Sequence, residues 1–395
     1  MARRTSEITL SPAVLKWARE TAGYSLDEVA EHFRIPGDRV VSWESVEPAR
    51  MTLHKLEDLA RYYKRPTAAL LLREPPPAAP VPHDFRRSAQ RQAPFSPELR
   101  LAVRRAYRLQ RFARETLQAM GQDFESDVSR ANPEDNPEDV ARGQRSSFGV
   151  TVAKQLEWKS AGEAFRRWRD AIESRIVPVF QGDFRRLEAQ GFSLTTALPY
   201  TIVVSVKDSF TARSFTLFHE FAHLLLRQGG ICQTEEALPP NGANATRVEE
   251  WCDRFAEAFL IDGDTLREKL ETELFLHRAA GYEQALRHLA NAFSVSQQVV
   301  LFRFWHLGLL EESRFWSEYR RVAEEAAAIA AMRGKKTEGK GGPPPAEKAV
   351  QERGPLFARA VLDALDREIL SGVDAIDFLG VKLKHLDKVR QAAHR

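Results

Sequence analysis

Cysteine is scarce in this 395-residue chain, which contains only Cys232 and Cys252. Two cysteines cannot make the disulfide framework of a small secreted protein, so we expect both to be reduced thiols. The chain also lacks an apolar run of 18 residues, and no signal-peptide apolar segment follows Met1. These absences argue against a membrane protein and against a secreted one. We therefore expect a cytoplasmic protein with no membrane segment.

A strong charge imbalance is missing as well. The chain has 58 Lys and Arg against 55 Asp and Glu, a formal net charge of +3. This mildly basic balance neither requires nor excludes a nucleic-acid partner. With 43% hydrophobic residues, the chain is long enough for two or three domains and a sizeable core.

The clearest chemical signal is the stretch RSFTLFHEFAHLLLR at residues 213–227. His219 and His223 are four residues apart, so on a helix both imidazoles leave the same face, with Glu220 on a neighbouring edge. Two neutral nitrogen ligands beside a carboxylate are the donor pattern of a catalytic zinc site. The alternative is a chance pattern on an amphipathic helix, with the histidines half-buried in its core. A third ligand is needed to decide between the two.

A candidate third ligand follows in the helix-forming stretch RVEEWCDRFAEAFL. Glu249 can complete a site of two His and one Glu, and Asp253, four residues later, can accept a ligand imidazole N–H and fix its tautomer. Glu250 is a competing ligand, but it points about 100° away on a helix. A solvated acidic face is the alternative interpretation. Cys252 is interpreted as a small buried residue, with a replacement metal ligand as the alternative.

Residues 10–72 predict a compact, all-helical module of four helices. Ser25 and Glu28 have the spacing of a capping box at the start of the second helix. Two short helices joined by a tight turn, at about residues 25–44, form a helix-turn-helix pattern. The segment resembles the XRE/Cro-type repressor domain at Ala30, Val40 and the Trp43-Glu44 pair.

That resemblance places the base-reading face near Arg39 and Ser42, and Arg34 and Arg39 are the predicted contacts if DNA is bound. Residues 1–70 contain eleven Lys or Arg and ten Asp or Glu, which is a weak footprint for phosphate binding. A module that docks on a protein or on the substrate is the alternative.

Three runs before the histidine helix predict strands, at residues 176–180, 191–194 and 201–206. The last run, TIVVSV, is β-branched and fits a half-buried strand. Its place just before the histidine helix suggests that it could offer its edge to an extended peptide, and a plain core strand is compatible with this hypothesis.

Several of these stretches together resemble the ImmA/IrrE family of metallopeptidases: FTLFHEFAH, the E-x-x-x-D-x-F-A helix that begins at Glu249, the PYTIVVS strand, and AFSVSQQVV. An XRE-type domain joined by a Pro-rich linker ending in Asp84-Phe85-Arg86 is one of that family's arrangements. The chain departs from the family where Cys252 stands at a position that is often Ala and Asp253 at one that is often Asn. Neither departure removes a ligand.

The resemblance implies a compact gluzincin-like peptidase domain with Zn2+ bound by His219, His223 and Glu249, and with Glu220 as general base. The expected fold is mainly α with a small β-sheet (α+β). We expect a helix-turn-helix domain at 1–72, a Pro-rich linker at 73–84 and the peptidase domain at 85–310. A helix and flexible linker at 311–348 and a C-terminal helical segment at 349–395 complete the chain.

For function, the resemblance implies a zinc-dependent regulatory endopeptidase that cleaves a transcriptional repressor or an antitoxin-type regulator, for example in a stress response. The N-terminal module would dock on DNA, through residues 10–72, or on the protein substrate. The alternative is a non-catalytic DNA-binding transcription regulator that uses the zinc domain as a sensor or partner-binding body. Glu220 favours the enzyme, because a structural zinc needs no base. The sequence does not identify the residue that stabilises the oxyanion; Tyr200 and His306 are candidates.

Overall fold

The structure is a computed structural model of the chain that describes residues 7–77, 95–121, 128–184, 189–228, 231–232, 243–276, 281–334 and 342–394. The chain divides into two compact units. The first consists of residues 1–81, 89–105 and 183–188, and the second of residues 82–88, 106–182 and 189–395. Residues 84–86, on which part of the linker prediction rests, lie outside the described residues.

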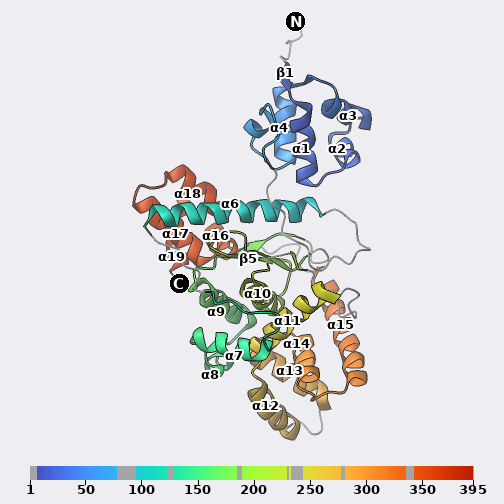
Figure 1. Cartoon of the computed structure of the whole chain (residues 1–395), viewed down its shortest axis with the longest axis vertical. Helices are drawn as coiled ribbons and strands as arrows, with labels where there is room; N and C mark the ends of the chain where they lie inside the picture. Colours follow the sequence, from blue (N-terminus) through green and yellow to red (C-terminus); the bar gives the residue numbers. More distant parts are fainter. Residues whose placement is uncertain are drawn as a thin grey trace. The chain divides into compact units, whose positions relative to one another are not determined.

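The first unit is built around five helices, drawn in blue in Figure 1: α1 (Pro12–Ala22), α2 (Leu26–Phe33), α3 (Gly37–Ser45), α4 (Leu53–Tyr62) and α5 (Thr67–Leu70). The predicted capping box is present, because the Ser25 hydroxyl accepts from the Glu28 N–H and the Glu28 carboxylate accepts from the Ser25 N–H. Gly23, at φ 90°, ends α1 in the left-handed conformation that glycine adopts without strain. The core of the unit includes Leu15, Val29, Val40, Trp43, Leu56 and Leu59.

The prediction that this module is all-helical is wrong in one respect. Strand β1 (Glu7–Leu10) pairs antiparallel with β2 (Ala49–Thr52) in a two-stranded sheet. Each strand has four residues, and the partners lie about 40 residues apart in the chain, with three helices between them. Local hydrophobic periodicity cannot detect such a long-range pairing. The wider prediction, a mainly α fold with a small sheet, is confirmed.

The second unit contains a four-stranded sheet in the order β3-β5-β4-β6. Its strands are β3 (Val179–Gly182), β4 (Gly191–Leu194), β5 (Thr201–Ser205) and β6 (Ile231–Cys232). β5 runs parallel to β3 and antiparallel to β4, and all five of its residues are buried. The prediction that this strand could offer its edge to a peptide is therefore wrong. A β-branched run without polar alternation marks a strand covered on both faces.

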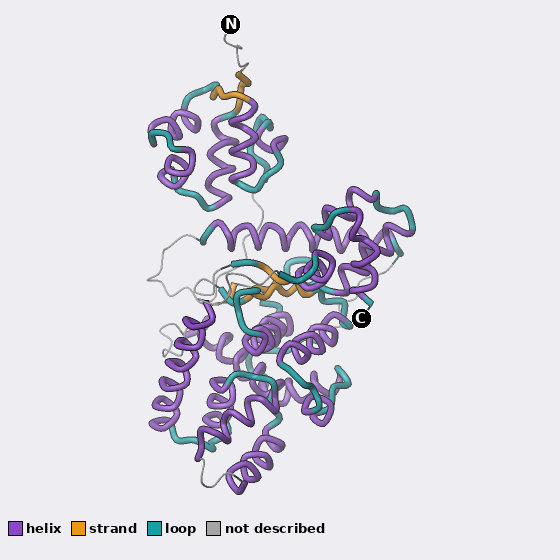
Figure 2. The backbone as a smooth tube through the Cα atoms, turned by 180° about the vertical axis from the view of Figure 1, so that it is seen from behind, coloured by secondary structure: helices purple, strands orange, loops and turns teal. Residues whose placement is uncertain are grey.

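Helices cover the sheet of the second unit on its two faces (Figures 1 and 2). Helix α10 (Phe210–Leu226) lies on one face, packed against β4 and β5. On the other side lie the second half of α6 (Pro97–Ala119), α16 (Pro345–Arg353) and α17 (Pro355–Asp366). The Gln110 amide, from α6, donates to the carbonyl oxygens of Ala197 and Pro199 and so holds the turn between β4 and β5.

The remaining helices extend the second unit. They are α7 (Pro137–Ser147), α8 (Val152–Leu156), α9 (Ala161–Glu173), α11 (Ala243–Leu260), α12 (Gly263–Leu276), α13 (Gly281–Phe293), α14 (Gln297–His306), α15 (Glu312–Gly334), α18 (Gly372–Leu379) and α19 (Leu386–Ala393). A single 3₁₀ turn, Leu383–His385, precedes α19. Within the described part of the chain, no helix has both the length and the apolar character needed to span a membrane.

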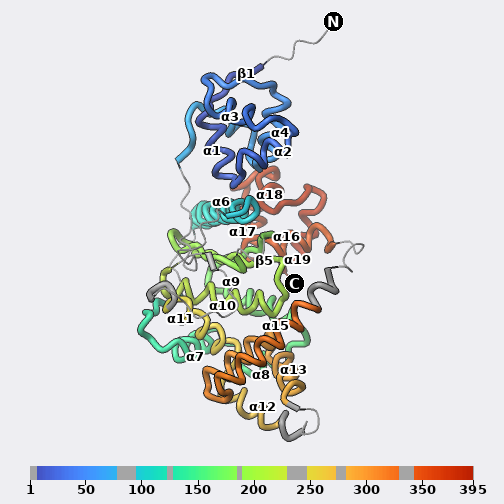
Figure 3. The backbone as a smooth tube through the Cα atoms, turned by 90° about the vertical axis from the view of Figure 1, so that its right-hand side faces the viewer, coloured from blue at the N-terminus to red at the C-terminus, as the bar shows by residue number. Residues whose placement is uncertain are grey.

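The C-terminal helices, red in Figure 3, attach beside the sheet through a buried carboxylate of α9. Glu173 accepts hydrogen bonds from the backbone N–H of Leu356 at 2.8 Å and of Val179 at 3.3 Å. Complete burial raises the pKa of Glu173 to about 7. Gly354, at φ 78°, lies directly against this carboxylate, where any larger residue would collide with it.

Candidate metal centre

Helix α10 is buried along most of its length, including the polar residues Ser214, Thr216, His219, Glu220 and His223. The Ser209 hydroxyl caps its start by accepting from the Ala212 N–H, and Arg227 ends it in the left-handed conformation. His219, Glu220 and His223 are at most 3% exposed. Polar groups removed from water in this way are costly unless they find partners.

Helix α11 brings the acidic residues to α10. Phe218 of α10 and Phe259 of α11 stack with ring centroids 3.9 Å apart, and the two helices pack along this contact. The Trp251 indole N–H donates to the Asp135 carbonyl oxygen at 2.8 Å, which attaches α11 to the loop before α7. These contacts place the buried carboxylate of Glu249 beside the two histidines.

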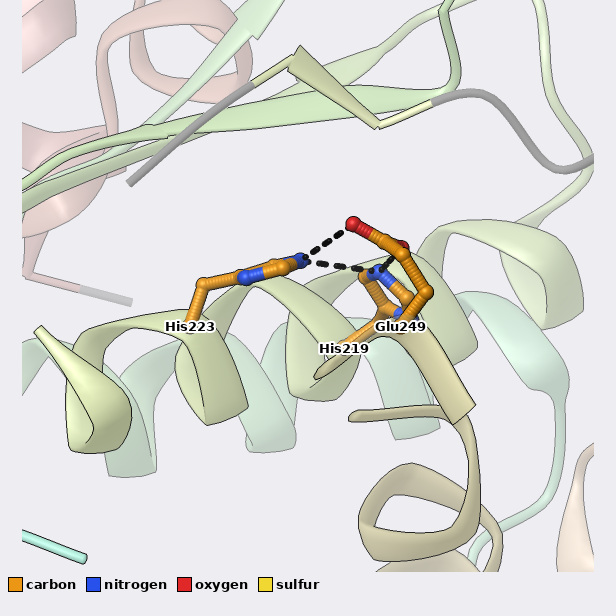
Figure 4. Close-up of side chains that lie close together, drawn as sticks. All are labelled: His219, His223 and Glu249. Carbon is orange, nitrogen blue, oxygen red and sulfur yellow. Dashed lines mark hydrogen bonds and ion pairs between the residues drawn. The ribbon is translucent and has the colours of Figure 1, made fainter. Parts of the chain in front are cut away.

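The three predicted ligands converge on one point (Figure 4). His219 Nε2 lies 3.1 Å from Glu249 Oε2, and His223 Nε2 lies 3.4 Å from Glu249 Oε1. The two Nε2 atoms are 3.2 Å apart. All three side chains are buried, and they form a group that could hold a metal ion.

The donor set and its spacing fit a small divalent metal. A tetrahedral zinc site with bonds of roughly 2.0–2.2 Å separates its ligand atoms by about 3.3–3.5 Å. The three observed separations, 3.1, 3.2 and 3.4 Å, lie at or just below that range. Two imidazole nitrogens also suit zinc and other transition metals better than magnesium or calcium, which take oxygen ligands. The residues present therefore fit such an ion.

Asp253 lies behind the first histidine. Its Oδ1 is 2.7 Å from His219 Nδ1, the nitrogen on the opposite side of the ring from Glu249. A carboxylate at this place holds the proton on Nδ1 and leaves Nε2 as the donor atom for a metal. One turn further along α11, the Glu257 carboxylate is bonded to His306 Nδ1 at 2.7 Å, and burial raises the pKa of Glu257. Sequence spacing pointed to Asp253 but not to the pairing of Glu257 with His306.

Glu220 lies between α10 and the sheet. A Cβ on Gly191 of β4 would be 3.2 Å from Glu220 Cγ and 2.5 Å from Thr216 Cγ2. The strand and the helix therefore approach each other at a glycine, because a larger residue would have to displace one of these side chains. No local pattern identifies Gly191, since its role depends on the packing of two distant segments.

The other site candidates from the sequence, which are Glu250, Cys252, Tyr200 and His306, do not join the three ligands. Glu250 is exposed, and Cys252 is buried in the core. Tyr200 lies under the Arg227 guanidinium, 4.8 Å from its ring centroid, and His306 is bonded to Glu257. None of these four belongs to the His219, His223 and Glu249 group.

In the first unit, the residues predicted to contact DNA lie at the surface. Arg34 and Arg39 are exposed, and Arg34 ends α2 in the left-handed conformation. Ser42 is half-buried, and its hydroxyl donates to the Arg39 carbonyl oxygen at 2.7 Å. Helices α2 and α3 are joined by three residues, at positions 34–36.

Comparison with known families adds one finding. Residues 173–304 match the IrrE N-terminal-like domain, a peptidase family. The match begins at the end of α9 and runs into α14, so it includes the sheet, α10 and α11. It supports the resemblance to the ImmA/IrrE family and indicates a metallopeptidase-type domain. The matched region does not include the helix-turn-helix pattern. No curated protein and no solved structure matches the chain significantly.

Proposed function

We propose that this protein is a zinc-dependent endopeptidase that cleaves a transcriptional repressor or an antitoxin-type regulator. The observation that carries the proposal is the buried convergence of His219, His223 and Glu249, with Glu220 on the same helix, inside a region that matches a peptidase family. Glu220 is the addition that a purely structural site would not need.

In this proposal, His219, His223 and Glu249 hold Zn2+, and Asp253 keeps His219 in the tautomer that leaves Nε2 available. Zinc held there would polarise a peptide carbonyl and make a water molecule nucleophilic near neutral pH. A three-residue ligand set leaves room for substrate beside the protein donors, as catalytic zinc sites do.

Glu220 is the general base of the proposed reaction. Its carboxylate takes a proton from the attacking water, whose oxygen forms the new bond to the carbonyl carbon. Glu220 then passes the proton to the amine that leaves when the C–N bond breaks. Burial of Glu220 against β4 keeps this carboxylate out of bulk water, where its interactions with reacting groups would be weaker.

The helix-turn-helix module is proposed to direct this activity. It would dock on DNA, with Arg34, Arg39 and Ser42 near the duplex, or on the substrate protein. A peptidase attached to a recognition module is suited to one regulator rather than to general protein digestion. We place the protein in the cytoplasm, where such regulators act.

The second candidate is a DNA-binding regulator without peptidase activity that uses the metal group as a sensor or partner-binding body. Exposed Arg34 and Arg39 would serve this function as well as the first. The two candidates differ in what they require of Glu220, which is dispensable for a sensor.

The deciding experiment profiles new protein N-termini in cells that express the wild type or Glu220→Gln, with and without a DNA-damage signal. Ends that appear only with the wild type and cluster in one DNA-binding regulator would support the peptidase and identify its substrate. General-base catalysis contributes roughly 10²–10⁴-fold, so the variant should yield almost none of these ends.

Glu250→Gln is the matched control. It removes an exposed carboxylate of α11, next to Glu249 in the sequence, and should leave the new ends unchanged. A metal assay shows whether Glu220→Gln still binds zinc, as the proposal requires. If wild type and Glu220→Gln give the same ends under every condition, the sensor interpretation replaces the peptidase.

A further inference from the structure

The face of β4 that points to α10 carries two residues without a role in the proposed mechanism, Gly191 and Ser193. They are in register with Val204 and Ile202 of β5. The side chains of Val204 and Ile202 lie in the same hydrophobic core as the apolar residues of α10. Cross-strand pairs and alternate residues share one face of a sheet, so Gly191 and Ser193 both face α10.

Two contacts show how β4 and α10 run past each other. At its beginning, β4 meets Thr216 and Glu220, which lie 2.5 and 3.2 Å from the place of a Cβ on Gly191. In the turn after β4, the ring of Tyr200 lies beside Arg227, at the end of α10. The strand and the helix therefore advance in the same direction.

Ser193 lies about one helical turn beyond Gly191. Two strand residues advance by about 6.7 Å, and four helical residues by about 6 Å. This places Ser193 over the turn of α10 that follows Glu220 and carries His223. Figure 4 shows strands of the sheet crossing the side of α10 from which both histidines project.

The hydroxyl of Ser193 is deeply buried. The residue is 1% exposed, and its Oγ has no hydrogen-bond partner among the described residues. Buried polar side-chain atoms nearly always have a partner, because leaving one without a partner is costly. A peptide carbonyl oxygen that gains negative charge during attack is a strong acceptor for such an O–H in a site shielded from water.

We propose that Ser193 donates a hydrogen bond to the scissile carbonyl oxygen of a bound peptide and stabilises the charge that develops there. The inference rests on the proposed peptidase function and supplies the donor that the sequence did not identify. Tyr200 and His306 are less suited, because Arg227 lies over the one and Glu257 is bonded to the other. The contact is with peptide backbone, so it would serve any extended peptide.

The test uses the full chain loaded with Co2+, whose visible absorption reports the ligands around the metal. Wild type, Ser193→Ala and Ser214→Ala are titrated with acetohydroxamic acid, which presents a carbonyl oxygen to the metal group. Ser193→Ala should bind about tenfold more weakly than wild type. Ser214→Ala is the matched control and should bind like wild type, because its buried hydroxyl donates to the Phe210 carbonyl oxygen within α10.

Thermal unfolding of the metal-free proteins tests the buried hydroxyl separately. Ser193→Ala should keep or raise the Tm, because it removes a buried polar atom without a protein partner, whereas Ser214→Ala should lower it. Equal hydroxamate affinities for wild type and Ser193→Ala would overturn the inference, as would a marked fall in the Tm of Ser193→Ala. Failure of the wild type to bind Co2+ would overturn the proposed function itself, and this inference with it.

Discussion

Two helices stand out in the sequence, α10 for its histidines and α3 for its place in a helix-turn-helix pattern, and their surroundings differ sharply. In α10, His219 and His223 are buried. Their ring nitrogens and a carboxylate oxygen of Glu249, from α11, lie within 4.8 Å of one another. In α3 only Val40 and Trp43 are buried, and Arg39 extends from the surface. Val41, on the same short helix, is 43% exposed.

The difference separates a group of predicted metal ligands that converge within the chain from a predicted recognition surface, whose partner would be another molecule. Metal ligands must meet at fixed distances, so spacing along a helix constrains them and the protein itself shows whether they converge. A recognition surface is complementary to a molecule outside the chain, and its residues need not touch one another. Perturbing the two helices should therefore have unlike consequences.

The largest effect is expected from removing a ligand of α10. His223→Ala should lose metal affinity by more than the roughly 10–100-fold typical of an outer-shell change, because one of only three protein donors disappears. Plasma emission on dialysed protein measures the bound metal. Asp253→Asn provides the graded comparison and should fall within that 10–100-fold range. Unchanged metal content in His223→Ala would exclude this group as the metal site.

The candidate site residues of α10 and α11 could be predicted from the sequence because they form two pairs, each within one helix. His219 and His223, and likewise Glu249 and Asp253, are four residues apart, and one helical turn brings each pair to one face. The spacing also distinguished Glu249 from Glu250, which the structure shows exposed. The structure brings all four spaced residues into contact across the two helices.

Contacts between distant segments were beyond such reasoning. The pairing of β1 with β2 joins residues about 40 positions apart, and the central place of β5 depends on neighbours on both sides. The roles of Ser193 and Gly191 depend on the packing of β4 against α10, which the sequence does not show. A serine and a glycine in a short strand are common in any protein, and their spacing does not indicate a function.

The close approach of β4 to α10 can be tested through its glycine. In Gly191→Ala the new Cβ would lie 2.5 Å from Thr216 Cγ2 and 2.9 Å from the Val203 carbonyl oxygen. Such overpacking typically lowers the free energy of unfolding by roughly 1–3 kcal/mol. Urea denaturation of the metal-free protein measures the loss.

Thr216→Ser supplies the matched partner, because it deletes the methyl group of the closest contact and keeps the hydroxyl that faces Gln190 Oε1. The double variant should recover part of the stability lost in Gly191→Ala, with a coupling of roughly 0.5–3 kcal/mol between the two sites. Strictly additive losses would show that the two segments do not approach as closely as described, and the position inferred for Ser193 would lose its support.

The smallest effect is expected on α3, where one exposed arginine is removed. Arg39→Ala should weaken binding of the full chain to a fluorescent DNA duplex and reduce the slope of log affinity against log salt by about one, as loss of a single phosphate contact does. Fluorescence anisotropy at several salt concentrations measures both quantities.

Arg61→Ala is the control of equal charge, since Arg61 is exposed on α4 and is paired with Asp58 at 2.7 Å. Equal losses in the two variants would indicate a general charge effect. Absence of DNA binding by the wild type would make α3 a protein-docking surface, and the contrast between the two helices would then lie between catalysis and protein recognition.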